Sequence, residues 1–485
     1  MGNPRFRLQP ASLNPPALTA NEDGVAEDYP PWVLLESQAY VADCKNATTA
    51  FSKTWDGHDI QVTICPRRPP HVSYMCVYSR DAEMPLEPQI LAMEEDLVVL
   101  CVTVSCQKDV MKNIDYYVYR ATGGVAYGKP SLTLLKRPPS PYNSFYAEHT
   151  GVMLCGTGHQ PTLGGQTGIY LRPHVQTVQR HYIIAALKAA PWEMQDEFPQ
   201  GNFILSLYNS KTEDWTVNTI SLNKEQRQQY GADFEHATSK VINIGGDAGT
   251  MGFVDLWRGV LLCDLFSDNG EVIPSPLRYI KLPSTRRNSL FRGDARLARD
   301  IAVINEQLKF VELQVHWKES RVCKGDLFED GWMAVTWSRP SSCLSGHWSR
   351  ECKVDSKDMN FQDSPYVKLL PKVLSDEDVL LPPFKRIDIC QPTLGLNVDD
   401  SCIVYFMIKV NRRDKDAWVV AVDMKTNTLQ GVAPFLAARN TFITFAYMHS
   451  RISTHLLKTA PGPHGHLKRP RVLPQATGKK LSGMG

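Results

Sequence analysis

Glycine-rich segments are the parts of this sequence that come nearest to a phosphate-binding site. Residues 156–168 read GTGHQPTLGGQTG, and repeated glycines let backbone amides approach an anion. A P-loop also needs Lys and then Ser or Thr after its last glycine, whereas Gly165 is followed by Gln166 and Thr167. We therefore predict an inter-strand loop at 156–168, and another at 245–249.

One segment gathers side chains that zinc could use. Cys343, His347 and Cys352 have the spacing Cys-x3-His-x4-Cys, and Cys323 precedes them. Zinc sites that can be recognised from sequence carry paired Cys-x2-Cys knuckles, which this segment lacks. Its Ser and Gly content is typical of a surface loop. We predict a loop here, with no metal and no cofactor.

Nucleophilic catalysis has no signature in the chain. There is no Gly-x-Ser-x-Gly elbow and no cysteine within a family-specific catalytic signature. His316, beside Trp317 at the end of an apolar run, is typical of a strand histidine rather than a general base. We predict no catalytic residue and a protein that is not an enzyme. The alternative is an enzyme whose polar site only the fold assembles.

Ser289 is the one modification site that the sequence suggests. It follows Arg286 and Arg287, and the surrounding residues 286–299 contain five arginines. Phosphorylation would add nearly two negative charges beside them and could order the loop. The same arginines and the basic C-terminal residues are the only features that favour nucleic acid. With 53 basic and 51 acidic residues, the whole chain has a net charge of +2, which argues against a nucleic-acid partner.

Composition restricts the protein class. The longest strongly apolar runs, near 97–106 and 402–410, are half the length of a membrane helix, so we expect no membrane span. The first residues resemble neither a signal peptide nor a transit peptide. Twelve scattered cysteines without a secretory signal indicate a reduced, intracellular protein, cytoplasmic or nuclear. Cysteines inside apolar runs behave as small hydrophobic residues, as we expect for Cys76, Cys101, Cys263 and Cys402.

Strand patterns organise the rest of the chain, most clearly at 251–283. This stretch predicts three short strands, at 251–257, 259–266 and 277–282, separated by turn residues. Similar short strands recur along the chain, one of them predicted at 366–370, while long amphipathic patterns are missing. The best short helix candidate is NKEQRQQ at 223–229, and HYIIAALKAA from 181 fits strand or helix. We predict an all-β fold with a few short helices, a β-propeller of about six irregular blades. The alternative is two β-sandwich or barrel domains with a boundary near 223–240.

One internal similarity supports repeated units. FILSLYNSKTEDWTV at 203–217 and WVVAVDMKTNTLQGV at 418–432 both read as strand, turn, strand. Asn209 and Asp423 open the two turns, Lys-Thr pairs follow at the same offset, and apolar Trp215 and Leu429 come six residues after the Asx residue. Such an Asx side chain can bond to its own backbone and tighten the turn.

Composition also predicts three parts: a disordered tail at 1–29, a propeller-like region at 30–455, and a disordered basic tail at 456–485. The last contains KRPR, a short basic cluster that an import receptor could read.

Five stretches together resemble a known plant family. They are PPWVLLESQAYVADCKNATTA at 30–50, PPHVSYMCVY at 69–78, GFVDLWRGVLLCDLF at 252–266, LRYIKLP at 277–283 and ARDIAVINEQLKFVEL at 298–313. The chain resembles domain of unknown function 1618 (DUF1618), which is abundant in grasses, from about residue 30 to about 448. The resemblance implies a plant origin and a β-rich fold akin to the F-box-associated propellers, and it implies no activity, cofactor or catalytic residue.

These observations favour a non-catalytic protein-interaction module or adaptor on a propeller scaffold, with an unidentified protein partner. Propeller faces carry loops from several blades on a rigid frame, so binding can vary without changes in the core.

Overall fold

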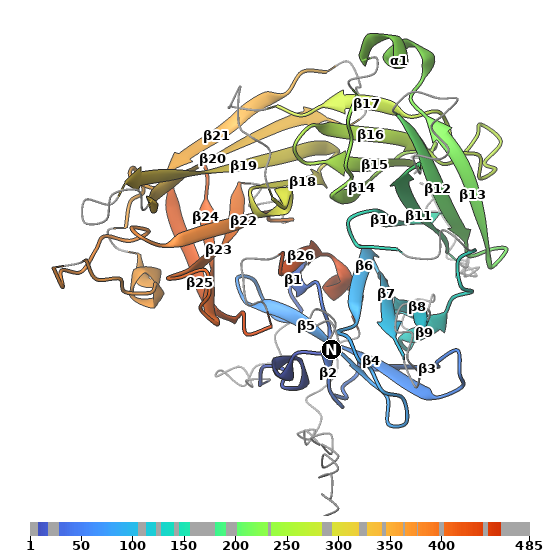
Figure 1. Ribbon diagram of the computed structural model, residues 1–485, viewed down its shortest axis with the longest axis horizontal. Coiled ribbons are helices and arrows are strands. Elements are labelled where there is room, and N and C mark those ends of the chain that lie inside the picture. Colours follow the sequence, from blue (N-terminus) through green and yellow to red (C-terminus); the bar gives the residue numbers. More distant parts are fainter. Residues whose placement is uncertain are drawn as a thin grey trace, which may run out of the picture.

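Six sheets arranged in a ring form a β-propeller (Figure 1). The computed structural model describes residues 8–17, 29–104, 113–122, 128–139, 145–155, 180–190, 201–230, 234–283, 293–319, 327–341, 346–361, 364–375, 377–396, 402–439 and 445–456. The predicted mainly-β propeller with about six blades is confirmed. Residues 223–240 link two neighbouring blades that share one apolar cluster, so no domain boundary lies there.

Blades 2 to 6 are antiparallel four-stranded sheets whose strands follow chain order from the centre of the ring outward. Their strands are β6 (Gln89–Glu94), β7 (Leu97–Thr103), β8 (Ile114–Arg120) and β9 (Ser131–Leu134) in blade 2; β10 (Thr150–Cys155), β11 (His181–Ala189), β12 (Asn202–Asn209) and β13 (Asp214–Ser221) in blade 3; β14 (Lys240–Gly245), β15 (Thr250–Asp255), β16 (Gly259–Asp264) and β17 (Arg278–Lys281) in blade 4; β18 (Arg299–Ile304), β19 (Gln307–Glu319), β20 (Leu327–Pro340) and β21 (Ser349–Asp355) in blade 5; β22 (Asp388–Leu394), β23 (Ile403–Lys409), β24 (Asp416–Asp423) and β25 (Thr428–Leu436) in blade 6.

Blade 1 joins the two ends of the described chain. Its strands are β1 (Val33–Glu36), β2 (Tyr40–Val41), β3 (Ala50–Lys53), β4 (Asp59–Cys65), β5 (Val72–Tyr78) and β26 (Tyr447–Ser450). The order is β26-β1-β5-β4-β3, with β26 antiparallel to β1, while β1 and β2 both pair with β5 in parallel. A strand from the end of the described chain thus closes the ring against the first strand.

A buried glutamine amide fastens this closure. Gln391 lies in an irregularity of β22, has φ of 53° and is fully buried. Its Nε2 donates to the backbone oxygen of Tyr447 at 2.9 Å, and its Oε1 accepts from the backbone N–H of Ala446 at 2.8 Å. Beside it, the buried Arg439 guanidinium pairs with Glu36 of β1. Blade 6 and blade 1 are therefore tied by bonds that water does not reach.

The core lies between adjacent sheets rather than at one centre. Separate apolar clusters join blades 1 and 2, blades 2 and 3, blades 3 and 4, and blades 4 and 5, and a larger one joins blades 5, 6 and 1. Strands buried on both faces explain why runs such as β16, Gly259–Asp264, are continuously apolar instead of alternating. Each blade buries its faces on its neighbours, so the ring is stable only as a whole.

The stretch at 251–283 forms β15, β16 and β17 of blade 4, as its pattern predicts. Gly259 begins β16 after a turn, and a Cβ there would lie 2.4 Å from the Ile280 backbone oxygen. The close approach of the two strands explains the glycine at this position.

The internal similarity marks the same hairpin in two blades. Residues 203–217 lie in β12 and β13, and residues 418–432 in β24 and β25, which are the outer two strands of blades 3 and 6. The backbone N–H of Lys211 donates to Asn209 Oδ1 at 2.9 Å, and that of Lys425 to Asp423 Oδ1 at 2.8 Å. The predicted Asx turns are confirmed, and Glu213 and Asn427 share a positive φ at equivalent offsets.

Of the other local predictions, the helix is confirmed, the ambiguous segment is settled as a strand, and one strand is wrong. The helix expected at 223–229 is α1 (Lys224–Tyr230), and the ambiguous segment from 181 is a strand. The strand expected at 366–370 is wrong: these residues form most of the 3-10 turn η6 (Pro365–Leu369), which Pro365 starts by fixing its own φ.

Short helical turns complete the described chain. They are η1 (Pro10–Leu13), η5 (Ala295–Leu297) and η7 (Ile452–His455). Within the segment 1–29 expected to be a loose tail, residues 8–17 lie against blade 1, where the Tyr74 hydroxyl donates to the Pro16 backbone oxygen at 2.8 Å. In the described part of the chain, every helix is too short to reach across a lipid bilayer.

A candidate functional site on the propeller axis

The innermost strands surround a cavity of about 320 Å³ on the ring axis. That volume falls at the lower end of small-molecule pockets. Its walls come from β6, β10, β14, β18 and β26, and from Leu396, which follows β22, so all six blades contribute. The polar and charged residues lining it are Glu94, Glu95, Thr150, Ser239, Lys240, Asn243, Arg296, His449, Ser450 and Arg451.

Asp300 is the point at which four blades meet. Its Oδ1 lies 2.5 Å from Lys240 Nζ of blade 4, and its Oδ2 accepts from the backbone N–H of Leu394 in blade 6 at 3.0 Å. The same oxygen lies 3.8 Å from Nδ1 of His449 in β26. Burial, followed by the charge of Lys240, lowers the pKa of His449 to about 3. The imidazole is therefore neutral at physiological pH, and Lys240 neutralises the carboxylate.

Glu94, at the end of β6, is the acidic group in the cavity with an unusual proton affinity. Burial raises the pKa of its carboxyl to about 7, and the neighbouring charge of Glu95 acts in the same direction, while a hydrogen bond from Asn243 opposes it. Glu95 differs because the His455 imidazole, 2.8 Å away, holds its pKa below the ordinary value. Glu94 can thus exchange a proton near neutrality, as a general acid or base must.

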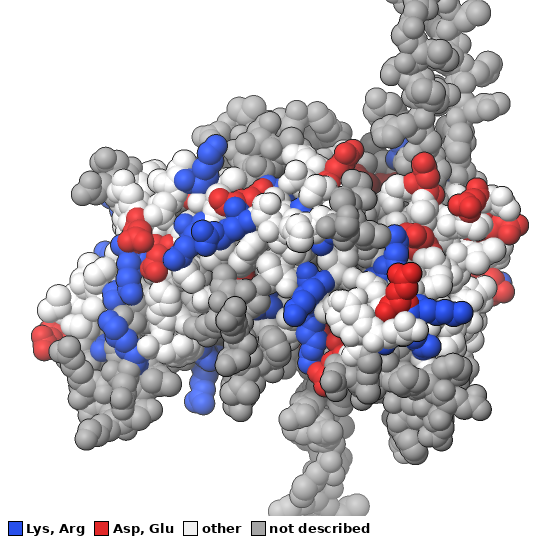
Figure 2. Space-filling model, turned by 90° about the horizontal axis from the view of Figure 1, so that it is seen from above, with Lys and Arg blue, Asp and Glu red and all other residues white. Residues whose placement is uncertain are grey.

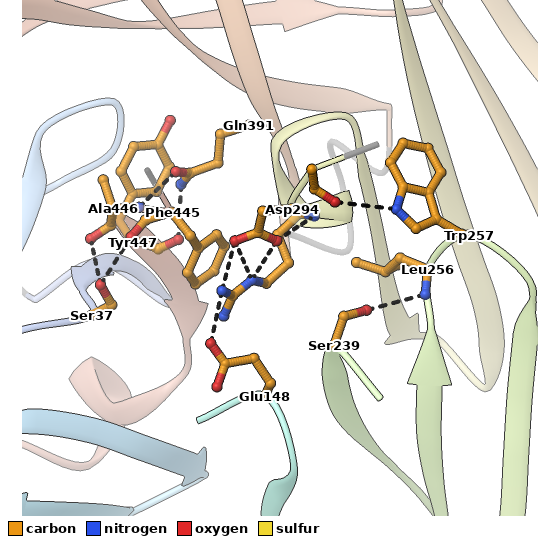
Figure 3. A network of polar contacts seen from close by, with 12 residues as sticks. Ser37, Glu148, Ser239, Leu256, Trp257, Asp294, Gln391, Phe445, Ala446 and Tyr447 are labelled. Carbon is orange, nitrogen blue, oxygen red and sulfur yellow. Dashed lines mark hydrogen bonds and ion pairs between the residues drawn. The ribbon is translucent and has the colours of Figure 1, made fainter. Parts of the chain in front are cut away.

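Arg296 occupies the cavity wall between blades 3 and 5 and the segment leading into β26. Its Nη2 lies 2.7 Å from Asp294 Oδ2 and 2.9 Å from Glu148 Oε1, and its guanidinium lies 4.4 Å from the centre of the Phe445 ring. Figure 3 shows Glu148 and Asp294 converging on this guanidinium beside Phe445. Two carboxylates and one ring hold the cation in a fixed position.

Those sequence-predicted site residues that the structure describes do not line this cavity. Ser289, Cys323 and Cys343, and the glycine-rich segment 156–168, fall outside the described residues. The second glycine-rich segment, 245–249, is the predicted loop, between β14 and β15.

The described members of the zinc and histidine candidates are dispersed. His347 is exposed before β21, and Cys352 on β21 lies beside Cys402 of the next blade. His316 is a half-buried histidine within β19. Sequence reasoning missed the axial residues because only the closed ring brings these segments of different blades together. The available signal was a polar residue inside an apolar inner strand, such as Asp300 in ARDIAVI.

Arginines of the basic stretch 286–299 are engaged within the fold where they are described. Arg296 makes the contacts above, and the buried Arg299 pairs with Glu312 and donates to the backbone oxygens of Leu256 and Trp257 at 3.0 and 3.1 Å. Across the face seen in Figure 2, blue and red side chains are interspersed. Neither observation adds a basic surface for nucleic acid.

A second candidate surface projects from the ring between blades 5 and 6. We call residues 364–385 the excursion; it is the orange lobe at the left of Figure 1. Four of its large apolar side chains are exposed by more than half, namely Leu369, Leu374, Val379 and Leu380 at 54%, 54%, 59% and 57%. Leu374, Val379 and Leu380 belong to one hairpin. Exposed apolar side chains that lie close together mark interaction sites more often than isolated ones do.

The excursion is anchored at its base. Phe384 is buried at 1% exposure, and its ring lies 5.7 Å from that of Trp332 in blade 5. At the tip, Leu374 and Leu380 form an antiparallel bridge. The backbone N–H of Ser375 donates to the Val379 oxygen at 2.8 Å. The apolar tip is therefore preformed by backbone bonds.

Comparison with known proteins supports the family over part of the chain. Residues 253–405 match the family described as "Protein of unknown function (DUF1618)". No curated protein matches the chain. Among solved structures, a mutant of B. megaterium levansucrase has 10% identity and a TM-score of 0.27, covering 82% of this chain and 91% of its own. The WD40 domain of SCAP from fission yeast has 11% identity and a TM-score of 0.25, covering 87% and 99%. Structural likeness at this level says nothing about activity.

Proposed function

We propose that this protein is a non-catalytic interaction module that binds a protein partner through the apolar tip of the excursion. The observation that carries the proposal is the exposure of Leu374, Val379 and Leu380 on one preformed hairpin. A partner that covered these side chains would remove apolar surface from water at little cost in ordering, because the tip is already held by its own backbone bonds.

The surroundings of the tip suit a protein partner. Lys368, Lys372, Glu377 and Asp378 are exposed around the apolar side chains and provide charges of both signs. An apolar centre with a polar rim is the usual anatomy of a protein interface. The partner expected here has an apolar groove with a mixed-charge border.

Several charged groups of the axial cavity are engaged in ion pairs within the fold, which supports a non-catalytic role. Lys240 is paired with Asp300, Arg296 with Asp294 and Glu148, and Glu95 with His455. Groups committed to partners on other blades hold the ring together. The competing function, an enzyme with its site on the axis, rests on Glu94, whose pKa of about 7 suits proton transfer.

One capture experiment separates the two. The tagged full chain, a Leu374→Ser/Leu380→Ser double variant, a Glu94→Gln variant and a version ending at Lys458 are used to isolate partners from plant lysate, the source that the family resemblance suggests. We expect one reproducible protein that the double variant loses and that the other two retain. As the matched control, Val217→Ser/Ile273→Ser removes apolar side chains that are exposed on other blades, at 38% and 55%, and should retain the partner.

Exposed substitutions of this kind change stability by only about 0.5 kcal/mol, so circular dichroism should not distinguish the double variants from the wild type. A partner that the Leu374→Ser/Leu380→Ser variant captures as well as the wild type would contradict the proposal. A partner or substrate whose binding depends on Glu94 alone would favour the enzyme instead.

A further inference from the structure

Blade 1 contains three cysteines whose sulfur atoms lie together. The Sγ atoms of Cys44, Cys65 and Cys76 are all within 4.8 Å of one another, and those of Cys44 and Cys65 are 3.7 Å apart. The residues are 8%, 0% and 1% exposed. Twenty residues separate the first two and ten the last two, so no short motif announces the cluster.

Strand pairing creates this arrangement. Cys65 on β4 lies opposite Tyr74, and Cys76 on β5 lies opposite Thr63, so the two cysteines are diagonal neighbours on one face of the hairpin. Cys44 follows β2, which pairs with β5 on its other edge through Tyr40 and Cys76. Three segments of the blade therefore each supply one thiol.

Hydrogen bonds fix the backbone that carries Cys44. The Thr63 hydroxyl donates to the Cys44 backbone oxygen at 2.6 Å, and the Cys44 N–H donates to the Ala42 oxygen at 3.0 Å. The aromatic rings of Tyr40 and Tyr74 complete the surrounding cluster. The site is thus built into the blade, with Cys44 retaining the largest exposure to solvent of the three.

The spacing of the sulfurs suits one shared metal ion. Thiolates bound to a single ion at ~2.3 Å lie about 3.8 to 4.0 Å from one another in tetrahedral or trigonal geometry. The separation of 3.7 Å between Cys44 and Cys65 agrees with this, and a limit of 4.8 Å for the other pairs leaves less than about 1 Å of adjustment.

Two arginines lie against the aromatic rings that surround the cluster. The Arg67 guanidinium lies 5.7 Å from the centre of the Tyr74 ring, and the Arg439 guanidinium lies 3.8 Å from that of Tyr40. The Sγ atoms of Cys44 and Cys65 already lie within hydrogen-bonding distance of each other. A metal ion bound by all three sulfurs would displace the thiol protons.

We propose that Cys44, Cys65 and Cys76 form a three-thiolate site for one monovalent copper ion. Soft thiolates select Cu(I) and Zn(II). Zinc almost always takes four ligands, whereas the described side chains of this group supply three sulfurs and neither imidazole nor carboxylate. Three sulfur ligands in an apolar, aromatic shell therefore favour Cu(I). This site is independent of the excursion and of the axial cavity.

The test uses the full chain, reduced and without oxygen. Cu(I) is added as its acetonitrile complex against a chromophoric Cu(I) chelator, and near-ultraviolet absorbance reports thiolate-to-copper charge transfer. We expect one equivalent of Cu(I) to bind. Cys44→Ser and Cys76→Ala should each weaken binding by more than about tenfold, because each removes one of three ligands. Cys263→Ser, which alters a fully buried cysteine of blade 4, should leave binding unchanged.

Thermal unfolding provides a second readout that does not depend on the chelator. A metal that binds only the native state raises the melting temperature. Cu(I) should do so for the wild type and for Cys263→Ser and not for Cys44→Ser. The proposal is overturned if Cu(I) does not bind stoichiometrically, if Cys44→Ser binds it as tightly as the wild type, or if Zn(II) at equal concentration displaces it.

Discussion

Replacement of Gln391 by alanine should open the ring at its closure. The side-chain amide makes two buried hydrogen bonds to the backbone of Ala446 and Tyr447. Its loss leaves one N–H and one carbonyl group without that partner, and each unsatisfied buried group costs about 1 to 3 kcal/mol. We expect the free energy of unfolding to fall by about 2 to 6 kcal/mol, a large share of the total for an ordinary domain.

The φ of 53° at Gln391 adds a second, separable term. Residues with a Cβ carry a cost of about 1 kcal/mol in the left-handed region, which glycine avoids. Gln391→Gly should therefore be less destabilised than Gln391→Ala by about 1 kcal/mol, although both lose the same two bonds. Gln430→Ala, which alters an exposed glutamine on β25, is the control and should change stability by less than about 0.5 kcal/mol.

Urea unfolding followed by tryptophan fluorescence measures the loss, and hydrogen exchange locates it. The Ala446 amide bonds directly to the glutamine oxygen, so peptides covering 445–456 should exchange faster in Gln391→Ala, whereas peptides from blades 3 and 4 should change less. The reasoning is refuted if the unfolding midpoint and the exchange of 445–456 both equal those of the wild type.

Three further predictions concern titrating groups and packing. The pKa of Glu94 is raised in the native protein, so the native protein binds this proton more tightly than the unfolded protein does. The group therefore lowers stability as pH rises from about 4.5 through about 7. Glu94→Gln should stabilise the protein by about 2 kcal/mol at pH 8 and not at pH 4, as measured by urea unfolding. The depressed pKa of His449 acts in the other sense, with stability lost as pH falls from 6.5 towards 3, so His449→Gln should flatten the dependence of unfolding free energy on pH between 6.5 and 4. Gly259→Ala should lower the free energy of unfolding by about 1 to 3 kcal/mol, because its Cβ meets the Ile280 backbone oxygen. In the same sheet, the Cβ of Gly252→Ala meets only side chains that can shift, so this variant should lose less. Equal losses in thermal unfolding would contradict this account.

Local structure could be read from the sequence wherever neighbouring residues decide it. Continuous apolar runs bounded by Gly, Asn, Asp and Pro predicted β15 to β17 within about two residues of their limits, and the shared Asx and Lys-Thr pattern placed equivalent hairpins in two blades. Such segments depend on turn chemistry and on burial of both sheet faces, which a short window of sequence contains.

The candidate sites could not be read in this way because they depend on distant pairings. Cys44, Cys65 and Cys76 come together through strand pairing across blade 1, and a scattered-cysteine pattern gives no indication of it. The raised pKa of Glu94 results from enclosure by other blades rather than from its neighbours in the chain. The strand expected at 366–370 was wrong because the apolar side chains there pack the excursion onto the core and do not pair in a sheet.

Because β1 pairs with β26, blade 1 cannot finish folding during translation until the last strand has been synthesised. The Glu36–Arg439 contact alone spans 403 residues, so the first blade waits for its last strand until nearly the whole propeller has left the ribosome. At translation rates of roughly 5 to 20 residues per second, that interval lasts about 20 to 80 seconds. Throughout it, β1 presents an unpaired apolar edge that other chains could extend. A nascent chain of this kind needs protection by chaperones at its beginning rather than at its end.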